Sequence, residues 1–174
     1  MKKEINWWIF TGPESTAKST LARQIAKQTG FPVVDEQARL LLEEGLFNDI
    51  GETELLAIAE HQWAAEILAY AREGLPIILD TDLVTMKVWY EWAIRQPCPE
   101  YWNERIASRH NVRYLLCHPD IDWEPDPLRE NQDDREELLE AYKRAILGLG
   151  FRFVDIKGSG EKRWQEVLRA FGIS

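Results

Sequence analysis

The sequence predicts an α/β fold, in which a five-stranded parallel sheet is covered by helices on both faces and forms three layers. Short apolar runs alternate with longer segments whose apolar residues recur every three or four positions. This alternation favours parallel strands, because each parallel connection needs a crossover helix. The run PIILD at 76–80 is apolar at consecutive positions, as expected for a strand that is buried on both faces.

The individual elements follow from local spacing and turn residues. The first strand ends in the run WWIF, and the segment 53–71 repeats apolar residues at helical spacing before Gly74 and Pro76 end it. The irregular stretch 118–132 contains three prolines, and we expect a lid-like segment at about 118–135. The predicted strands are 4–10, 31–35, 76–80, 112–117 and 151–156, and the predicted helices are 18–29, 36–45, 52–73, 83–95, 100–109, 133–149 and 160–171.

The composition is that of one domain, 1–174, with a sizeable core, because 45% of the 174 residues are apolar. A net charge of −9 disfavours nucleic acid and anionic membranes as partners. No run reaches the roughly 20 apolar residues that a membrane helix needs.

Cys98 and Cys117 form no C-x-x-C pair, which favours a reduced, cytoplasmic setting.

A phosphate-binding loop, here the segment 12–19, connects the first strand to the first helix. The pattern G-x-x-x-x-G-K-[ST] is matched at Gly12, Lys18 and Ser19, while Ala17 replaces the second glycine. If position 17 is left-handed, alanine costs roughly 1–2 kcal/mol there. The strand and helix that flank the loop favour a P-loop NTPase that binds ATP and Mg²⁺ over an ordinary strand-turn-helix corner. The nucleotide-binding residues that we expect in this loop are Gly12, Pro13, Glu14, Ser15, Thr16, Ala17, Lys18, Ser19 and Thr20.

Acidic residues follow the third strand, where ligands of a parallel sheet are bound. Asp80 ends this strand and has the place of an acid that holds Mg²⁺ together with the Ser19 hydroxyl. A strand-end aspartate that caps the next helix is the alternative, and it suits Asp82 better than Asp80. For Asp82, substrate contact and helix cap remain equally open.

Polar and aromatic residues after the second and third strands predict an acceptor site. Asp35 and Glu36 begin the string DEQAR, and one of them could accept a proton from a hydroxyl or bind sugar hydroxyls, with Arg39 one helical turn later. Acids in the first turn of a helix are the structural alternative. Trp89 could stack on a base, although aromatic residues at helical spacing more often belong to the core.

Two arginines flank the irregular stretch. Arg129 and Arg135 could close over the phosphates, and the alternative is a solvated loop with surface ion pairs. The three histidines, His61, His110 and His118, do not have the spacing of metal ligands.

Several strings together resemble one family. They are GPESTAKST in the phosphate loop, E-x-A-R at 36–39, DTDLVTMKVW at 80–89, and WEPDPLREN with the following DDREE at 123–137. With these strings the chain resembles the ribosylnicotinamide kinase domain of the NAD-biosynthesis regulator family and its stand-alone relatives, the AAA-type or NadR-like ATPases. The resemblance extends over nearly the whole chain.

The resemblance implies a nucleoside-kinase-like fold, ATP and Mg²⁺ as cosubstrates, and phosphorylation of the 5′-hydroxyl of nicotinamide riboside. It implies that Lys18 and Ser19 serve phosphate and Mg²⁺, that Glu36 with Asp80 or Asp82 serves acceptor and metal, and that Trp89 stacks on the nicotinamide ring. It also places Arg129 and Arg135 in a lid, and Gly158 and Ser159 near adenine. The alternative functions are a non-catalytic ATP-binding switch that acts through a protein partner and a kinase fold that has lost its activity.

Overall fold

The computed structural model describes residues 4–46, 50–125 and 131–173, and it contains a five-stranded sheet in the order β2-β3-β1-β4-β5. All neighbouring strands are parallel, which confirms the predicted fold class. The strands are β1 (Trp7–Thr11), β2 (Val33–Val34), β3 (Ile77–Asp80), β4 (Val112–Cys117) and β5 (Phe153–Ile156).

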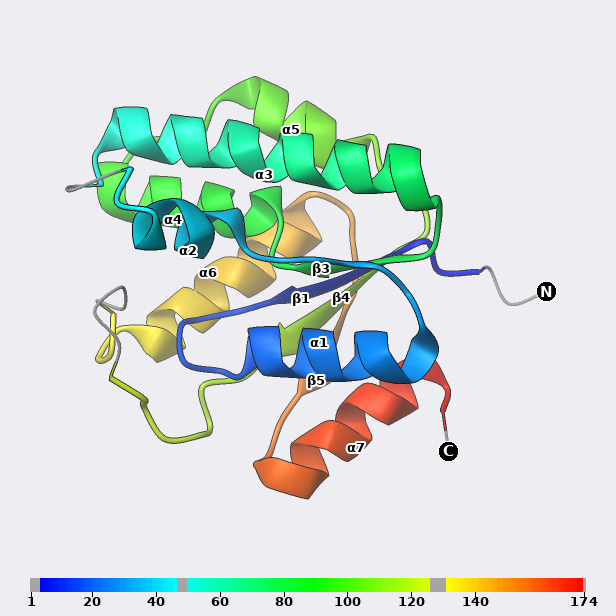
Figure 1. The fold of residues 1–174 in the computed structure, drawn as a ribbon. Helices are drawn as coiled ribbons and strands as arrows, with labels where there is room; N and C mark the ends of the chain where they lie inside the picture. The colour runs from blue at the N-terminus through cyan, green and yellow to red at the C-terminus, as the bar shows by residue number, and fades with distance from the viewer. Residues whose placement is uncertain (1–3, 47–49, 126–130, 174) are drawn as a thin grey trace.

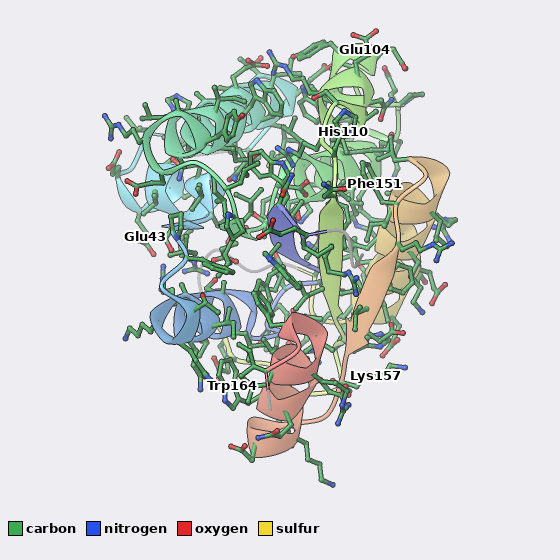
Figure 2. The ribbon with its side chains drawn as sticks, turned by 90° about the vertical axis from the view of Figure 1, so that its right-hand side faces the viewer. Glu43, Glu104, His110, Phe151, Lys157 and Trp164 are labelled. Atoms are coloured by element: carbon green, nitrogen blue, oxygen red, sulfur yellow. The ribbon has the colours of Figure 1, made fainter. Side chains whose placement is uncertain are left out.

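Helices cover both faces of the sheet, so the three predicted layers are present (Figure 1). The helices are α1 (Lys18–Thr29), α2 (Gln37–Glu43), α3 (Glu52–Glu73), α4 (Leu83–Ile94), α5 (Glu100–Ala107), α6 (Arg135–Gly148) and α7 (Gly160–Phe171). Helices α1 and α7 pack on one face, and α2 to α6 pack on the other. Figure 2 shows these layers from the side, with Trp164 of α7 and Glu104 of α5 on opposite sides of the sheet.

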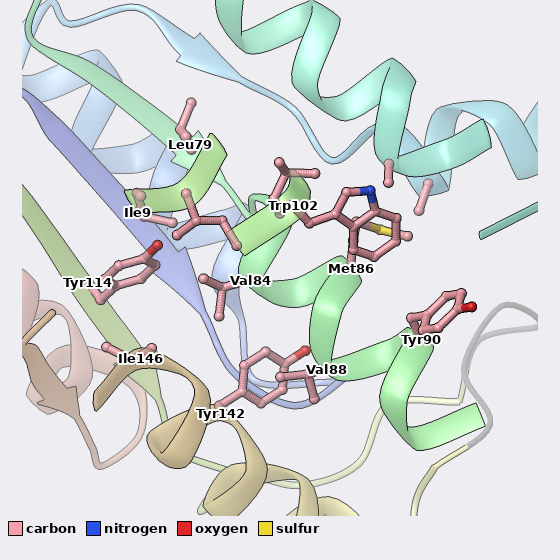
Figure 3. Close-up of a cluster of buried hydrophobic side chains, with 14 of the residues drawn as sticks. Ile9, Leu79, Val84, Met86, Val88, Tyr90, Trp102, Tyr114, Tyr142 and Ile146 are labelled. Atoms are coloured by element: carbon pink, nitrogen blue, oxygen red, sulfur yellow. The ribbon is translucent and has the colours of Figure 1, made fainter. Parts of the chain in front are cut away.

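The core consists of two apolar clusters because alternate residues of a strand point to opposite faces. In β1, Trp7 and Ile9 join the larger cluster, while Trp8 and Phe10 join the cluster under α1 and α7. Figure 3 shows the larger cluster, in which side chains of α4, α5 and α6 pack on Ile9, Leu79 and Tyr114. All five strands are therefore held between two dry layers.

The observed elements differ from the predicted ones mainly at their ends. Strand 31–35 shortens to β2, which pairs only with β3 at the edge of the sheet. Helix 133–149 shortens to α6, and helix 36–45 shortens to α2. Within the part of the chain that the structure describes, no helix is both long and apolar enough to cross a membrane.

The topology creates a crevice at the carboxyl edge of the sheet. The neighbouring strands β1 and β3 are followed by α1 and α4, and these helices pack on opposite faces (Figure 1). Chains that leave adjacent strands toward opposite faces open a gap between their loops, where ligands of α/β proteins bind. The phosphate loop and the residues after β2 and β3 meet at this gap.

Candidate active site

The phosphate loop has a backbone that two small residues make possible. Gly12 has φ of 128°, and a Cβ at this position would lie 2.5 Å from the backbone oxygen of Cys117, so only glycine fits. Ala17 has φ of 63° and ψ of 21°, so it adopts the left-handed conformation that is unfavourable for alanine. Ser15 is also left-handed, with φ of 54°. The loop therefore keeps its turned shape without the second glycine.

Hydrogen bonds within the loop fix its shape further. The Thr16 hydroxyl donates to the Pro13 carbonyl oxygen at 2.8 Å, and Nζ of Lys18 donates to the same oxygen at 2.7 Å. The Ser15 hydroxyl accepts a bond from the Glu124 backbone N–H at 2.8 Å, which ties the segment after β4 to the loop. The lysine side chain is thus folded over the loop, where it can exchange the carbonyl for a phosphate oxygen.

A cavity of about 300 Å³ lies beside the phosphate loop and brings most of the predicted site residues together. It extends from the loop to the start of α2 and to the outer side of α4. The predicted residues that line it are Glu14, Ser15, Thr16, Ala17, Lys18, Ser19, Thr20, Glu36, Arg39 and Trp89.

Asp80 lies at the end of β3 and is 1% exposed. Burial raises the pKa of its carboxyl, while a hydrogen bond from the Ser19 hydroxyl and the charge of Lys18 lower it. Among the described residues, its Oδ1 has no hydrogen-bond partner. A buried carboxylate oxygen without a partner is costly, and it is expected where a ligand completes the site.

The pair of Ser19 and Asp80 fits Mg²⁺. Both offer hard oxygen atoms, and the carboxylate has an unused one. No group of three or more His, Cys, Asp or Glu side chains in the described ranges could hold a metal ion by itself. Mg²⁺ in phosphate sites commonly takes one or two protein ligands and completes its shell with water and phosphate oxygens.

Glu36 combines access to the cavity with a pKa suited to proton transfer. It precedes α2 as its N-cap residue, yet its side chain makes no capping bond and lines the cavity instead. Burial raises the pKa of its carboxyl to about 7, against a lowering by the charge of Lys18 and with a further rise from Asp80. A carboxylate with this pKa can accept a proton near neutral pH.

The neighbours of Glu36 have different roles. Asp35 forms an ion pair with Arg23 at 2.9 Å, and both side chains are well exposed. Arg39 lines the cavity and is 3.4 Å from the carboxylate of Glu43. Of the two acids that begin DEQAR, Glu36 is the one placed for chemistry.

Trp89 contacts both the core and the cavity. It is half-buried on α4, packs against the larger apolar cluster and also lines the cavity. The indole therefore packs partly on the core and partly borders the cavity that Glu36 and Arg39 also line. Such a fixed ring is a suitable platform for a planar ligand.

Asp82 caps a helix, which is one of the two alternatives that the sequence left open. It caps α4, since its Oδ1 accepts a hydrogen bond from the Val84 N–H at 3.0 Å. Its Oδ2 accepts bonds from Arg109 and from the Tyr114 hydroxyl, both at 2.9 Å. The side chain is fully buried away from the cavity, so of the two alternatives the cap is the one that the structure shows.

The remaining predicted residues among those that the structure describes do not line the cavity. Arg135 donates to the Ile121 carbonyl at 3.1 Å and its guanidinium lies 5.5 Å from the Trp123 ring centre, so it supports the segment after β4. Arg129 lies outside the described residues. The Gly158 N–H donates to Asp120 at 2.7 Å, and Ser159 is the N-cap residue of α7. Their place near adenine stays a prediction.

Four buried polar residues near the site were missed from the sequence. Arg163 is 2% exposed and donates to the backbone carbonyls of Ile156, Gly158 and His118, which joins the loops after β4 and β5. The other three belong to a network behind Asp82. Gln62 and Glu66 are bonded one helical turn apart, but their other partners are distant in the chain, so no local signal marks the network as buried; these three residues are Gln62, Glu66 and Arg109.

A phosphate loop at the carboxyl edge of a five-stranded parallel sheet, with a buried acid at the end of the adjacent strand, defines the P-loop class of nucleotide-binding proteins. Within that class, the chain belongs to the family described as AAA domain, whose model matches residues 7–163.

Solved structures share the fold at low sequence identity. A NadR protein in complex with NR has a TM-score of 0.77 and 19% identity, over 98% of this chain and 52% of that chain. A NadR protein in complex with NAD and AMP-PNP has a TM-score of 0.72 and 18% identity, over 98% of this chain and 50% of that chain. A deoxyadenosine kinase from M. mycoides, with dCMP and dCDP bound, has a TM-score of 0.65 and 13% identity, over 95% of this chain and 98% of that chain.

These likenesses show a nucleoside-kinase-like P-loop fold, which confirms the predicted fold class. The chain spans about half the length of the NadR chains that it matches.

Proposed function

We propose that this chain is an ATP- and Mg²⁺-dependent kinase that phosphorylates the 5′-hydroxyl of a nucleoside, with nicotinamide riboside as its acceptor. The observation that carries the proposal is the cavity itself. It joins a phosphate loop with Lys18 to a carboxylate, Glu36, whose pKa of about 7 suits a general base, and to the aromatic surface of Trp89. A nucleotide-binding switch would need the first of these features and would have no use for the other two.

The nucleotide half of the site is the phosphate loop. Its backbone N–H groups surround the phosphates, and Lys18 leaves the Pro13 carbonyl to bind the β- and γ-phosphates. Ser19 and Asp80 would hold Mg²⁺, with the unpartnered Oδ1 of Asp80 supplying the missing ligand directly or through water. When bound, Mg²⁺ neutralises charge on the β- and γ-phosphate oxygens.

The acceptor half of the site is formed around Glu36. Its carboxylate takes the proton of the 5′-hydroxyl as the acceptor oxygen forms a bond to the γ-phosphorus. The bond between that phosphorus and the oxygen bridging to the β-phosphate breaks at the same time, and ADP leaves with the bond's electron pair. Lys18 stays on the transferred phosphoryl group and stabilises its negative charge.

Acidic and aromatic side chains in the cavity lining support a cationic aromatic acceptor. Glu14 and Glu36 line the cavity together with Trp89, and the face of an indole attracts cations. Nicotinamide riboside carries a positive charge on its planar pyridinium ring, whereas the common nucleosides are neutral. The family resemblance points to the same acceptor, and a NadR protein that shares this fold was solved in complex with NR.

The proposal is tested by measuring ADP formation with ATP, Mg²⁺ and a panel of nucleosides. We expect ADP formation to depend on the acceptor and to be fastest with nicotinamide riboside. Lys18→Ala should lower turnover by about 10²–10³-fold. Lys27→Ala is the matched control, because Lys27 is exposed in the last turn of the same helix. A folded protein that forms no ADP with any acceptor would contradict the proposal and favour the switch.

Trp89→Ala tests the acceptor half separately. Loss of a stacking surface should raise the KM for nicotinamide riboside about tenfold, with the KM for ATP little changed. Trp92→Ala is the control, since Trp92 packs against the same apolar cluster and does not line the cavity. If both variants lose stability alike and neither changes the acceptor KM, Trp89 belongs to the core alone.

A further inference from the structure

A buried glutamine connects the segments that follow β2 and β3. Gln62 lies in the middle of α3 and is 2% exposed. Its Oε1 accepts a hydrogen bond from the Gln37 N–H at 3.1 Å, and its Nε2 donates to the Thr81 carbonyl oxygen at 3.4 Å. Gln37 directly follows Glu36, and Thr81 directly follows Asp80. One side chain thus holds the backbone next to each of the two carboxylates.

The bond to Gln37 explains why Glu36 can face the cavity. Gln37 is the first residue of α2, and the N–H groups of a first helical turn have no partner within the helix. Usually the side chain of the preceding residue satisfies one of them. Here Glu36 makes no capping bond, and Gln62 supplies an acceptor for the Gln37 N–H from another helix. The Glu36 carboxylate is therefore left to the cavity.

The bond to Thr81 holds a strained turn. Thr81 has φ of 67°, a left-handed conformation that is unfavourable for a residue branched at Cβ. Its N–H donates to the Phe10 carbonyl at 3.0 Å, and its own carbonyl accepts the bond from Gln62. This turn directs the Asp80 side chain toward Ser19 and the Asp82 side chain away from the cavity.

Gln62 is itself fixed by a chain of buried polar groups. Its Nε2 also donates to Oε1 of Glu66 at 2.8 Å, and the other oxygen of Glu66 is ion-paired with Arg109. Arg109 bonds Asp82 at 2.9 Å and lies over the rings of Trp7 and Trp63. An amide whose oxygen and nitrogen are both engaged has one orientation, and its position is set by this rigid support.

From this geometry we infer that Gln62 is a positioning residue for phosphoryl transfer, which keeps Glu36 and Asp80 at a fixed separation across the acceptor site. The inference rests on the proposed function, since it assigns Glu36 and Asp80 to the reaction. Gln62 does not line the cavity and acts only through the backbone of Gln37 and Thr81.

The test compares Gln62→Leu with Tyr114→Phe. Tyr114→Phe also removes a buried hydrogen bond from this network, the one to Asp82, without contacting Gln37. Gln62→Leu should lower kcat about tenfold or more, because small displacements of catalytic groups are costly, and leave the KM for ATP within about threefold. Tyr114→Phe should lose stability and keep its kcat. A Gln62→Leu variant with the parent kcat, or two variants with equal losses of kcat, would overturn the inference.

A second measurement separates this inference from the proposed function. Hydrogen exchange of the Gln37 amide in the ligand-free protein should be about tenfold or more faster in Gln62→Leu and unchanged in Tyr114→Phe. If the parent protein forms no ADP with any acceptor, the proposed function fails and the exchange result alone decides whether Gln62 holds this loop. Unchanged exchange in Gln62→Leu overturns the inference. If Gln62→Leu does not fold, Gln62→Met is measured in the same way.

Discussion

Asp80 and Asp82 lie two residues apart at the end of β3, and both are buried, with 1% and 0% exposure. Among the described residues, Oδ1 of Asp80 has no hydrogen-bond partner, whereas both oxygens of Asp82 accept bonds, from Val84, Arg109 and Tyr114. Burial alone therefore does not separate the carboxylate that we propose for the reaction from the structural one. The difference lies in whether the surrounding protein already satisfies the buried oxygens.

The same contrast extends to the two groups of residues around these aspartates. The site cluster, which we define as Lys18, Ser19, Glu36 and Asp80, contains two carboxyls whose pKa values are raised by burial. The buried network consists of Gln62, Glu66, Asp82, Arg109 and Tyr114, whose polar groups are bonded to one another. Removing a charge from the site cluster should abolish function without loss of stability, whereas removing one from the network should chiefly lower the free energy of unfolding.

Asp80→Asn should give the largest functional effect. The substitution removes the charge proposed to hold Mg²⁺, and we expect kcat to fall by about 10²–10³-fold. Because burial disfavours the charged carboxylate, the variant should melt at the same temperature as the parent or higher. Turnover and thermal melting measured on one preparation check both parts. Asp82→Asn is the control: burial raises the pKa of Asp82 as well, to about 7, but its oxygens accept bonds from Val84, Arg109 and Tyr114, so this variant should lose stability. An unstable Asp80→Asn would contradict the comparison.

Arg109→Leu should give the largest loss of stability. It leaves the buried carboxylates of Glu66 and Asp82 without their cation, which typically costs about 3–5 kcal/mol. In a chain of this size the melting temperature should fall by about 10 °C. Chemical denaturation and calorimetry measure the change.

Arg105→Leu is the matched control for Arg109→Leu. Arg105 also lies over the ring of Trp63 and pairs with a glutamate, Glu60, but both charged side chains are partly exposed. An ion pair of this kind contributes about 0–1 kcal/mol. If both variants lost the same free energy of unfolding, the buried ion pairs of the network would contribute no more to stability than an exposed pair.

The raised pKa of Glu36 predicts that both activity and stability depend on pH. As a base it must be ionised, so kcat/KM for the acceptor should fall about tenfold per pH unit below its pKa of about 7. Its pKa is higher in the folded protein than its ordinary value of 4.5, so the folded state loses stability as pH rises from 4.5 to about 7. Glu36→Gln should therefore lose activity, match the parent's stability below pH 4.5 and exceed it above pH 7. A parent with pH-independent kcat/KM would exclude this role.

Much of the fold was predictable because its signals are local. Helical spacing, turn glycines and prolines, and consecutive apolar residues lie within short windows, and they place every strand and helix that the structure describes. The residues at strand ends were predictable for a related reason, since a parallel sheet brings them to one edge. The cavity at this edge is lined by three of the predicted residues, Lys18, Glu36 and Trp89.

The rest of the site depends on contacts that the sequence does not encode locally. Gln62 and Glu66 lie one helical turn apart on α3, a pattern typical of an exposed helix face, but tertiary contacts with Gln37, Thr81 and Arg109 bury them. Arg135 was predicted to close over the phosphates, which stays a prediction, and its hydrogen bond to the Ile121 carbonyl has no signal in the sequence. Whether a polar side chain faces a ligand or another element is decided by the tertiary structure.

Ala17→Gly should give the smallest effect. It compares two positions of the phosphate loop, Gly12 and Ala17. Gly12 cannot carry a side chain, because a Cβ would meet the Cys117 backbone at 2.5 Å. Ala17 is also left-handed, yet its methyl group packs against the apolar cluster under α1 and α7. Glycine would relieve roughly 1–2 kcal/mol of backbone strain. It would lose that packing and about 0.5–1 kcal/mol through the greater freedom of the unfolded chain.

These opposing effects should nearly cancel, so Ala17→Gly should change the free energy of unfolding by less than about 1 kcal/mol. The KM for ATP should stay within about twofold, because the backbone N–H groups that bind phosphate keep their directions. Gly12→Ala is the contrasting variant, and it should weaken ATP binding by forcing the loop away from β4. A strong gain of ATP affinity in Ala17→Gly would mean that the alanine holds the loop in a poor shape and would support loss of function. An unchanged affinity identifies Ala17 as a residue that the loop accommodates through packing.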